Sequence, residues 1–313
     1  MHATQSASMH PPALVVLAAG MGSRYGGLKQ LDPIGHDGET FLDYSVFDAA
    51  RAGFGRIVFV IRREFADEFQ CRVLPRYAGN LDVLCVFQEL DDLPPGFSPP
   101  ALRIRPWGTL HAVLAARQVL NGFFAVVNAD DFYGCDAYQR MAAFCRQWAV
   151  AGCPPDVGAM LAYDIRKTLS PSGGVNRAIC RTRGESLESV VEMADVHLRS
   201  DGKVMGCNAA GQLQVIVSEA QGSMNFWGLT PTLLNKMGEQ FARFLVRQGA
   251  DLTAECYLPS AIDELITTQQ MVCRVLPTDS EWFGVTYLHD RTWCADRLRQ
   301  LTEAGIYPQR LWL

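Results

Sequence analysis

The first half of the chain alternates continuous apolar runs with segments whose apolar residues recur at helical spacing. Apolar runs without polar interruption are typical of strands that are buried on both faces of a largely parallel sheet. We expect strands at 13–19, 56–61, 81–87 and 123–128. We expect helices at 40–52, 63–74 and 109–120. This alternation predicts a doubly wound α/β sheet with right-handed crossovers, in which ligands bind where the strands end.

The second half of the chain has a less regular pattern. Short β-type segments are separated by turns, and we expect strands at 157–163, 175–180, 189–192 and 212–217. Helical spacing returns at 231–248, 254–267 and 291–304. Because no linker rich in Gly or Ser and no internal repeat separates the halves, we expect one domain over 13–313 after a flexible tail at 1–12. Its halves would be 13–160 and 161–313.

Composition and charge narrow the functional classes. With 313 residues, 49% hydrophobic and 19% charged, the chain is long and apolar enough to bury a large core, which excludes disorder. Lys and Arg number 28 against 33 Asp and Glu, so no basic surplus suggests nucleic-acid binding. No apolar run near the start approaches the roughly 20 residues that a bilayer requires, so we expect no signal peptide, no membrane span and a cytoplasmic location.

The ten cysteines do not indicate a metal site. They are scattered, and no two form a C-x-x-C pair, so a zinc site is not expected. Many have apolar neighbours, which is typical of thiols that serve as small core residues in a reducing compartment.

A glycine-rich loop follows the first predicted strand, in the segment 17–31 (LAAGMGSRYGGLKQL). Its glycines are Gly20, Gly22, Gly26 and Gly27. Glycines let backbone N–H groups approach a ligand closely, and Arg24 and Lys29 add two positive charges, so the loop suits a phosphate group. It is not a Walker loop, because Gln30 follows the lysine, and it is not the dinucleotide fingerprint, because Tyr25 stands where the third glycine belongs.

A pair of carboxylates follows the strand predicted at 123–128. The segment 126–134 (VVNADDFYG) places Asp130 and Asp131 just after this strand. Hard oxygen ligands at a strand end suit Mg²⁺ that also contacts substrate phosphates. An Asp in this position is also a common helix cap or turn former, so the pair alone leaves both interpretations open.

Together the two motifs resemble the nucleotidyltransferase family that activates sugar 1-phosphates. The pattern LAAGxGxRxGxxK and the Asp pair about a hundred residues later carry the resemblance, which extends from residue 13 to about 290. Gln88 after a strand, the segment 106–112 (PWGTLHA), and the later segments GGVNR, VE and MNFWG are similar to the family's substrate-binding parts. The resemblance implies a Rossmann-like, glycosyltransferase-A-like fold: a mainly parallel mixed sheet flanked by helices, with a β-rich substrate-side subdomain.

The resemblance also implies roles for individual residues. It assigns catalysis to Arg24 and Lys29, and the metal, Mg²⁺, to Asp130 and Asp131. The implied nucleotide-binding residues, all in the 13–160 half, are Ala19, Gly20, Gly22, Gln88, Gly108 and Thr109. The implied acceptor-binding residues, all in the 161–313 half, are Gly174, Glu192 and Asn225.

Two positions depart from the family pattern. The family usually has Lys directly after the glutamate, and this chain has Met193 there. A second metal-binding Asp is common in a late W-x-D segment, where this chain reads Trp282-Phe283-Gly284. Asp131 and Asp279 are the two candidate substitutes for that ligand.

The implied activity is nucleotidyl transfer from a nucleoside triphosphate to a phosphorylated small molecule, with release of pyrophosphate. The Gly-Thr-x-His-Ala order resembles uridylyl-transferring members, which favours UTP and a sugar 1-phosphate. A cytidylyltransferase acting on a phosphorylated alcohol such as phosphocholine stays open, as does a silent nucleotide-binding regulator. Guanylyl transfer to molybdenum cofactor fits less well, and the loop disfavours a nicotinamide oxidoreductase. The sequence is compatible with a homo-oligomer.

Overall fold

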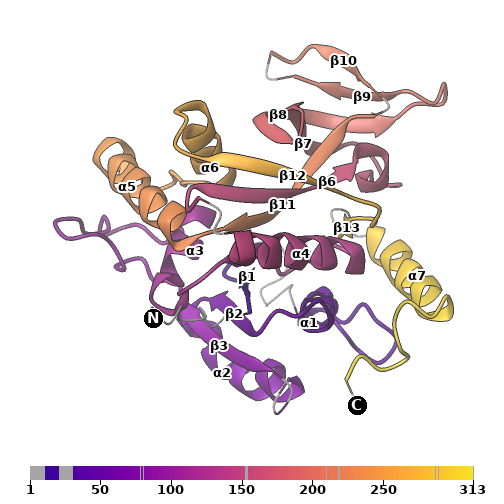
Figure 1. Ribbon diagram of the computed structural model, residues 1–313, viewed down its shortest axis with the longest axis horizontal. Helices are drawn as coiled ribbons and strands as arrows, with labels where there is room; N and C mark the ends of the chain where they lie inside the picture. Colours follow the sequence, from indigo (N-terminus) through magenta and orange to yellow (C-terminus); the bar gives the residue numbers. More distant parts are fainter. Residues whose placement is uncertain are drawn as a thin grey trace, which may run out of the picture.

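A single mixed sheet passes through both halves of the molecule (Figure 1). The structure is a computed structural model that describes residues 11–20, 31–77, 79, 81–151, 154–208, 210–217, 219–285, 287 and 289–312. In this part of the chain the sheet has eleven strands, in the order β10-β9-β8-β12-β6-β11-β4-β1-β2-β3, with β7 paired to β11 and β8. Residues 1–10 of the expected tail lie outside the described residues.

The first half contributes the parallel part of the sheet. Its strands are β1 (Ala13–Leu17), β2 (Arg56–Ile61), β3 (Asp82–Phe87) and β4 (Phe124–Asn128). β1 pairs in parallel with β2 and β4, and β2 pairs in parallel with β3. All four strands therefore end at the same edge of the sheet, as the alternating pattern predicts.

The second half extends the sheet mainly with antiparallel strands. They are β6 (Val157–Asp164), β7 (Val175–Arg183), β8 (Ser186–Leu198), β9 (Val204–Cys207), β10 (Leu213–Ile216), β11 (Gln221–Leu229) and β12 (Val272–Thr278). β11 pairs antiparallel with β4 and β6, and β12 returns parallel to β6. A separate two-stranded sheet joins β5 (Asp131–Phe132) to β13 (Phe283–Gly284).

Helices cover both faces of the central sheet. They are α1 (Phe41–Ala52), α3 (Thr109–Ala115), α4 (Cys135–Ala151), α5 (Pro231–Gln248), α6 (Leu258–Thr267) and α7 (Asp290–Glu303). Alternate strand residues point to opposite faces, so Val16 packs with α1 and α4, whereas Val15 packs with α3, α5 and α6. The predicted α/β fold with a mixed sheet flanked by helices is confirmed.

The predicted elements differ from the structure in three places. The helix expected at 63–74 is a chain of short helical turns that includes α2 (Ala66–Glu68) and continues to Arg76. The helix expected at 254–267 begins only at Leu258. Helix α4 and strands β9, β11 and β12 were not predicted. No helix in the described part of the chain is long and apolar enough to cross a membrane.

Candidate active site

The carboxyl ends of the parallel strands bring the predicted motifs to one edge of the sheet. Leu17 at the end of β1 pairs with Asn128 at the end of β4, and the Ala129 amide donates to the Leu17 carbonyl at 3.1 Å. The Gln88 amide continues the β2–β3 ladder by donating to the Ile61 carbonyl at 2.9 Å. The glycine-rich loop, the Asp pair and Gln88 therefore leave the sheet at adjacent positions.

The structure describes only the start of the glycine-rich loop. Ala19 is buried and Gly20 is exposed at the end of β1. The predicted Gly22, Arg24 and Lys29 lie outside the described residues.

Two neighbouring side chains hold the Asp131 carboxyl in place. The side chain of Asp131 accepts at Oδ2 from Asn128 Nδ2 at 2.8 Å and from the Tyr133 hydroxyl at 3.3 Å. Burial raises the pKa of the Asp131 carboxyl to about 7, and the negative charge of Asp130 acts in the same direction. Two carboxylates that repel each other at a strand end favour a bound cation.

Gly284 stands where the family pattern has the aspartate of its W-x-D segment, and it lies against Asp131. Gly284 pairs with Asp131 in the two-stranded sheet, and a Cβ at position 284 would be 2.7 Å from Asp131 Oδ1. The Asp131 carboxyl thus occupies the space beside the position where the family pattern has its late aspartate. The other candidate, Asp279, has a highly exposed side chain beside Arg140 at the surface.

Asn225, one of the residues predicted to bind the acceptor, is linked to Asp131 through Asn128. Its Nδ2 donates to Asn128 Oδ1 at 2.7 Å, and its Oδ1 accepts from Trp227 Nε1 at 2.8 Å. The backbone of Asn225 has a φ of 61°, a left-handed conformation, within a bulge of β11. At this bulge β11 changes partner from β4 to β7. Asn225 therefore occupies the point where the sheet splits beside the end of β4.

The turn at Gly108 is locked against a distant segment. Gly108 has a φ of 95°, and a Cβ there would be 2.4 Å from the carbonyl oxygen of Cys256. The Thr109 hydroxyl accepts from the Leu258 amide at 2.9 Å and so caps the approach to α6. Trp107 is fully buried in the core, and its Nε1 donates to the Leu90 carbonyl at 3.0 Å.

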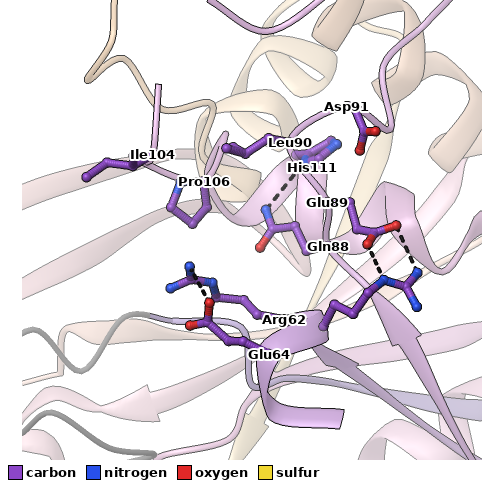
Figure 2. A pocket seen from close by; sticks show the side chains of 10 residues that line it. Arg62, Glu64, Gln88, Glu89, Leu90, Asp91, Ile104, Pro106 and His111 are labelled. Atoms are coloured by element: carbon purple, nitrogen blue, oxygen red, sulfur yellow. Dashed lines mark hydrogen bonds and ion pairs between the residues drawn. The ribbon is translucent and has the colours of Figure 1, made fainter. Parts of the chain in front are cut away.

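A cavity of about 270 Å³ opens beside the ends of β2 and β3. It is lined by Arg62, Arg63, Glu64, Gln88, Glu89, Leu90, Asp91, Ile104, Pro106 and His111. Figure 2 shows Gln88 and His111 close together at its wall, with Leu90 and Pro106 nearby. Four of the charged lining residues form two ion pairs, Arg62 with Glu64 and Arg63 with Glu89, and Asp91 is the fifth charged residue. The remaining wall is apolar and neutral polar, and this part suits a flat heterocyclic ring.

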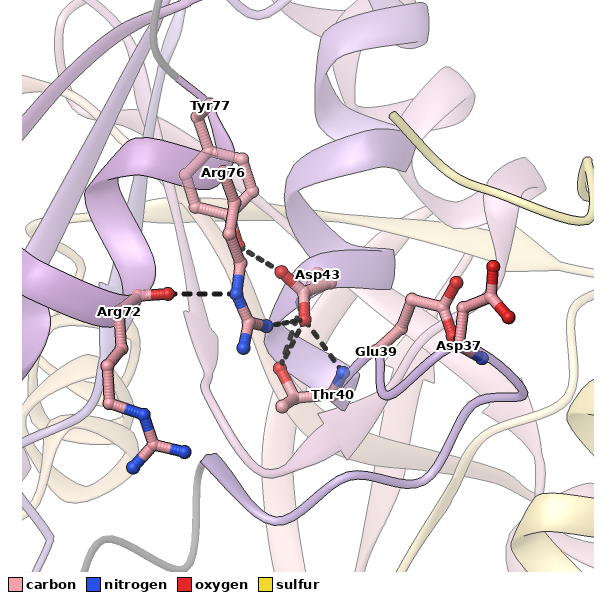
Figure 3. Close-up of polar contacts among 7 residues, drawn as sticks. All are labelled: Asp37, Glu39, Thr40, Asp43, Arg72, Arg76 and Tyr77. Carbon is pink, nitrogen blue, oxygen red and sulfur yellow. Dashed lines mark hydrogen bonds and ion pairs between the residues drawn. The ribbon is translucent and has the colours of Figure 1, made fainter. Parts of the chain in front are cut away.

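The segment after the glycine-rich loop is anchored at the start of α1 (Figure 3). Thr40 and Asp43 form a capping box, in which Asp43 accepts from the Thr40 amide at 2.7 Å. The same buried carboxylate accepts from the Tyr77 hydroxyl at 2.6 Å and pairs with Arg76. These contacts fix the downstream end of the segment to which the loop is attached.

The predicted acceptor residues Gly174 and Glu192 belong to the β-rich part. Glu192 on β8 is exposed and lies opposite Ala178 on β7, which in turn lies opposite Ser223 on β11. Residues opposite each other on neighbouring strands point to the same face, so Glu192 faces the same side as Ser223, two strands away. The Gly174 carbonyl accepts from the Tyr287 hydroxyl at 2.6 Å. Glu192 is therefore separated by strand β7 from Ser223, which stands two residues before Asn225.

Sequence reasoning did not assign roles to Asn128, Tyr133 or Arg177. Arg177 is buried and lies opposite Met193, the residue that replaces the expected lysine. Burial lowers the pKa of its guanidinium to about 10, and nearby Asp131 opposes this change. All three residues stand inside motifs quoted from the sequence. Asn128 and Tyr133 contact Asp131 locally, whereas only the fold brings Arg177 near Asp131.

One protein-family model matches part of the chain. The model of the MobA-like NTP transferase domain matches residues 14–91, which include the glycine-rich loop and Gln88. This part of the chain is similar to NTP transferase domains, in agreement with the sequence motifs. No curated protein sequence matches it significantly.

Two solved structures share the fold of this chain along nearly its whole length. The inositol-1-phosphate CTP transferase from T. maritima has a TM-score of 0.58 and 10% identity, over 94% of this chain and 97% of the other. A UDP-glucose pyrophosphorylase complexed with UDP-glucose also has a TM-score of 0.58, with 13% identity, over 93% of this chain and 99% of the other. At these identities the likeness concerns the fold alone.

Proposed function

We propose that this nucleotidyltransferase transfers a nucleoside monophosphate from a triphosphate, UTP being preferred, to a sugar 1-phosphate. The observation that carries the proposal is that Gly20, Gln88 and Asp130 follow the parallel strands β1, β3 and β4, which end at one edge of the sheet, while Asn225 contacts Asn128 at the end of β4. Along this edge the order of the strands supports an acceptor site at β11, a carboxylate pair at β4, a phosphate site at β1 and a base site at β3.

The reaction needs positioning and charge neutralisation more than proton transfer. A nonbridging oxygen of the sugar phosphate forms a bond to the α-phosphorus, and the bond from that phosphorus to the β-bridging oxygen breaks. Pyrophosphate leaves with the electron pair. The attacking phosphate is already ionised at neutral pH, so no general base is required. The protein must hold two anions in line, which fits a site built from backbone amides and cations.

In this proposal each part of the edge has one role. Ala19, Gly20 and Gly22 hold the triphosphate with Arg24, Lys29 lies at the reacting phosphates, and Gln88 contacts the base beside Gly108. Thr109 supports this turn through its bond to the Leu258 amide. On the acceptor side, Asn225, Gly174 and Glu192 bind the sugar phosphate.

The residues at the end of β4 fit a divalent cation such as Mg²⁺. No group of three or more His, Cys, Asp or Glu side chains converges among the described residues. Magnesium is commonly bound by one or two carboxylates together with substrate phosphates, which matches Asp130 and Asp131. The cation would neutralise charge on the phosphates, while Asn128 and Tyr133 orient the Asp131 carboxyl.

The second candidate is cytidylyl transfer to a phosphorylated alcohol. It is supported by the inositol-1-phosphate CTP transferase, which resembles this chain in fold as closely as the UDP-glucose pyrophosphorylase does. The loop and the Asp pair would serve both reactions equally, so the two candidates differ only in base and acceptor.

Pyrophosphate release tests the proposal. The purified protein is incubated with Mg²⁺, each of the four ribonucleoside triphosphates, and a panel of sugar 1-phosphates and phosphorylated alcohols. We expect pyrophosphate with UTP and a sugar 1-phosphate, and none when either substrate is omitted. Release only with CTP and a phosphorylated alcohol would favour the second candidate, and an Asp130→Ala protein serves as the inactive control.

A further inference from the structure

Gln88 belongs to a chain of hydrogen bonds that reaches behind the cavity wall. Its amide nitrogen Nε2 is 3.0 Å from the Gly108 carbonyl oxygen and 3.3 Å from His111 Nδ1. The other ring nitrogen of His111, Nε2, is 2.9 Å from the Asp92 carbonyl oxygen. The chain therefore begins and ends at backbone carbonyl groups.

These two carbonyls determine the direction of every hydrogen bond between them. A carbonyl oxygen only accepts, so the nitrogen of the Gln88 amide must face Gly108 and His111 Nε2 must carry the proton that faces Asp92. The neutral ring then has no proton on Nδ1, which accepts the second hydrogen of the Gln88 amide. An amide turned the other way would place its oxygen against the Gly108 carbonyl.

The His111 ring is itself held in place. It is buried and stacks on Phe241, with ring centroids 5.0 Å apart. Its carbonyl partner belongs to Asp92, whose side chain forms two hydrogen bonds with Arg117, at 2.7 and 2.9 Å. Burial also lowers the pKa of His111, which favours the neutral ring.

As a result, the Gln88 side chain presents its carbonyl oxygen to the cavity. Both hydrogens of its amide are engaged with Gly108 and His111. Within the described residues, no group donates to its oxygen, and the side chain lines the cavity. A ligand in the cavity therefore meets a hydrogen-bond acceptor at Gln88.

We propose that His111 is a positioning residue that fixes the Gln88 amide with its oxygen toward the base, so that the site selects uracil over cytosine. This inference rests on the proposed function for the presence of a nucleotide. Uracil carries an N–H at ring position N3, which can donate to the Gln88 oxygen. Cytosine carries a lone pair at N3, so the same placement would set two acceptors against each other.

Two substitutions of His111 separate positioning from packing. In His111→Phe the ring still packs on Phe241, but one of the two acceptors that hold the Gln88 amide is lost and only the Gly108 carbonyl remains. The amide can then turn more easily and direct an N–H toward cytosine N3. In His111→Asn the side-chain oxygen stands near the former Nδ1 and still accepts from Gln88, while the contact with Asp92 is lost. His289→Phe, at an exposed position before α7, controls for a general effect of the exchange.

The readout is the ratio of kcat/KM for UTP to that for CTP with one acceptor, measured together with the ratio of binding constants for the two nucleotides. We expect the wild type and His289→Phe to prefer UTP by about tenfold or more, because a mispaired polar group costs at least about 1.4 kcal/mol. His111→Phe lowers the ratio about tenfold, and His111→Asn keeps most of it. An unchanged ratio in His111→Phe, or a wild type that prefers CTP, would overturn the inference.

The binding ratio and the tautomer keep this test independent of turnover. If no pyrophosphate forms but UTP binds better than CTP and His111→Phe removes that preference, the proposed function fails and the inference stands. Nitrogen-15 NMR of the wild type, with the His111 signals assigned by comparison with His111→Asn, should show a proton on Nε2 and none on Nδ1. The opposite tautomer would overturn the inference even if His111→Phe did not fold.

Discussion

Substitutions of Asn225 test the polar chain that links the acceptor side to the Asp pair. Three changes separate its contributions. Asn225→Ala removes the hydrogen bonds to Trp227 and Asn128 and keeps a Cβ at a φ of 61°. Asn225→Gly removes the same bonds but relieves the backbone. Asn225→Asp keeps an acceptor for Trp227 and adds a negative charge near the Asp pair.

The expected free-energy changes follow from these contacts. An indole N–H left without a partner costs about 1–3 kcal/mol, and a left-handed backbone costs a non-glycine residue about 1 kcal/mol. We therefore expect Asn225→Ala to lower the free energy of unfolding by about 2–4 kcal/mol, and Asn225→Gly by about 1 kcal/mol less. Asn225→Asp should also lower the free energy of unfolding, by about 1–3 kcal/mol, because it sets a carboxylate oxygen against Asn128 Oδ1.

Activity should follow a different order. The charge in Asn225→Asp repels the sugar phosphate and opposes the orientation of Asn128, so we expect kcat/KM for the acceptor to fall about a hundredfold or more. Urea unfolding gives the stabilities, and pyrophosphate release gives the rates. Equal stability of the Ala and Gly proteins would refute the backbone argument. An Asp protein with wild-type kcat/KM would remove Asn225 from the acceptor site.

Three further predictions concern the Asp pair and the fold. Arg24→Ala and Asp130→Ala should each lower kcat by about two orders of magnitude with unchanged urea unfolding, and an unchanged rate would remove that residue from the site. Asp131→Ala should also lower the rate. Adding Gly284→Asp should restore part of it, because position 284 faces the space that the Asp131 carboxyl leaves. A double variant no more active than Asp131→Ala would contradict this geometry. Burial raises the pKa of Asp48 from 3.8 to about 6, so the folded protein binds that proton more tightly, and stability should fall as the pH rises through this window. Asp48→Asn should remove roughly 3 kcal/mol of this fall in urea titrations at a series of pH values, and an unchanged pH dependence would assign it to other groups.

The local sequence pattern was sufficient for the elements that have uninterrupted apolar runs or clear helical spacing. The helices at α1 and α5 and the strands β1 to β4 fall within a residue or two of their predicted bounds. Helix α4 could also have been predicted, since its buried Ala137, Tyr138, Met141 and Cys145 recur at helical spacing. Strand β12 was missed because Arg274 and Pro277 interrupt its apolar residues.

The candidate site divides in the same way. The sequence pattern alone identified the glycine-rich loop and the Asp pair as candidate site segments, because each directly follows one predicted strand. The hydrogen bond between Asn225 and Asn128 joins residues 97 positions apart, and no local pattern encodes it. The amide direction of Gln88 likewise depends on the backbone of Gly108 and Asp92, which only the folded chain brings together.

The most direct test of nucleotidyl transfer follows the α-phosphorus itself. UTP labelled at the α-phosphorus is incubated with the protein, Mg²⁺ and a sugar 1-phosphate, and the products are separated after phosphatase treatment. We predict that the label appears in a product that resists phosphatase and yields UMP with phosphodiesterase, in an amount equal to the pyrophosphate released. Label found only in UTP and its hydrolysis products, with every acceptor tried, would contradict the assignment.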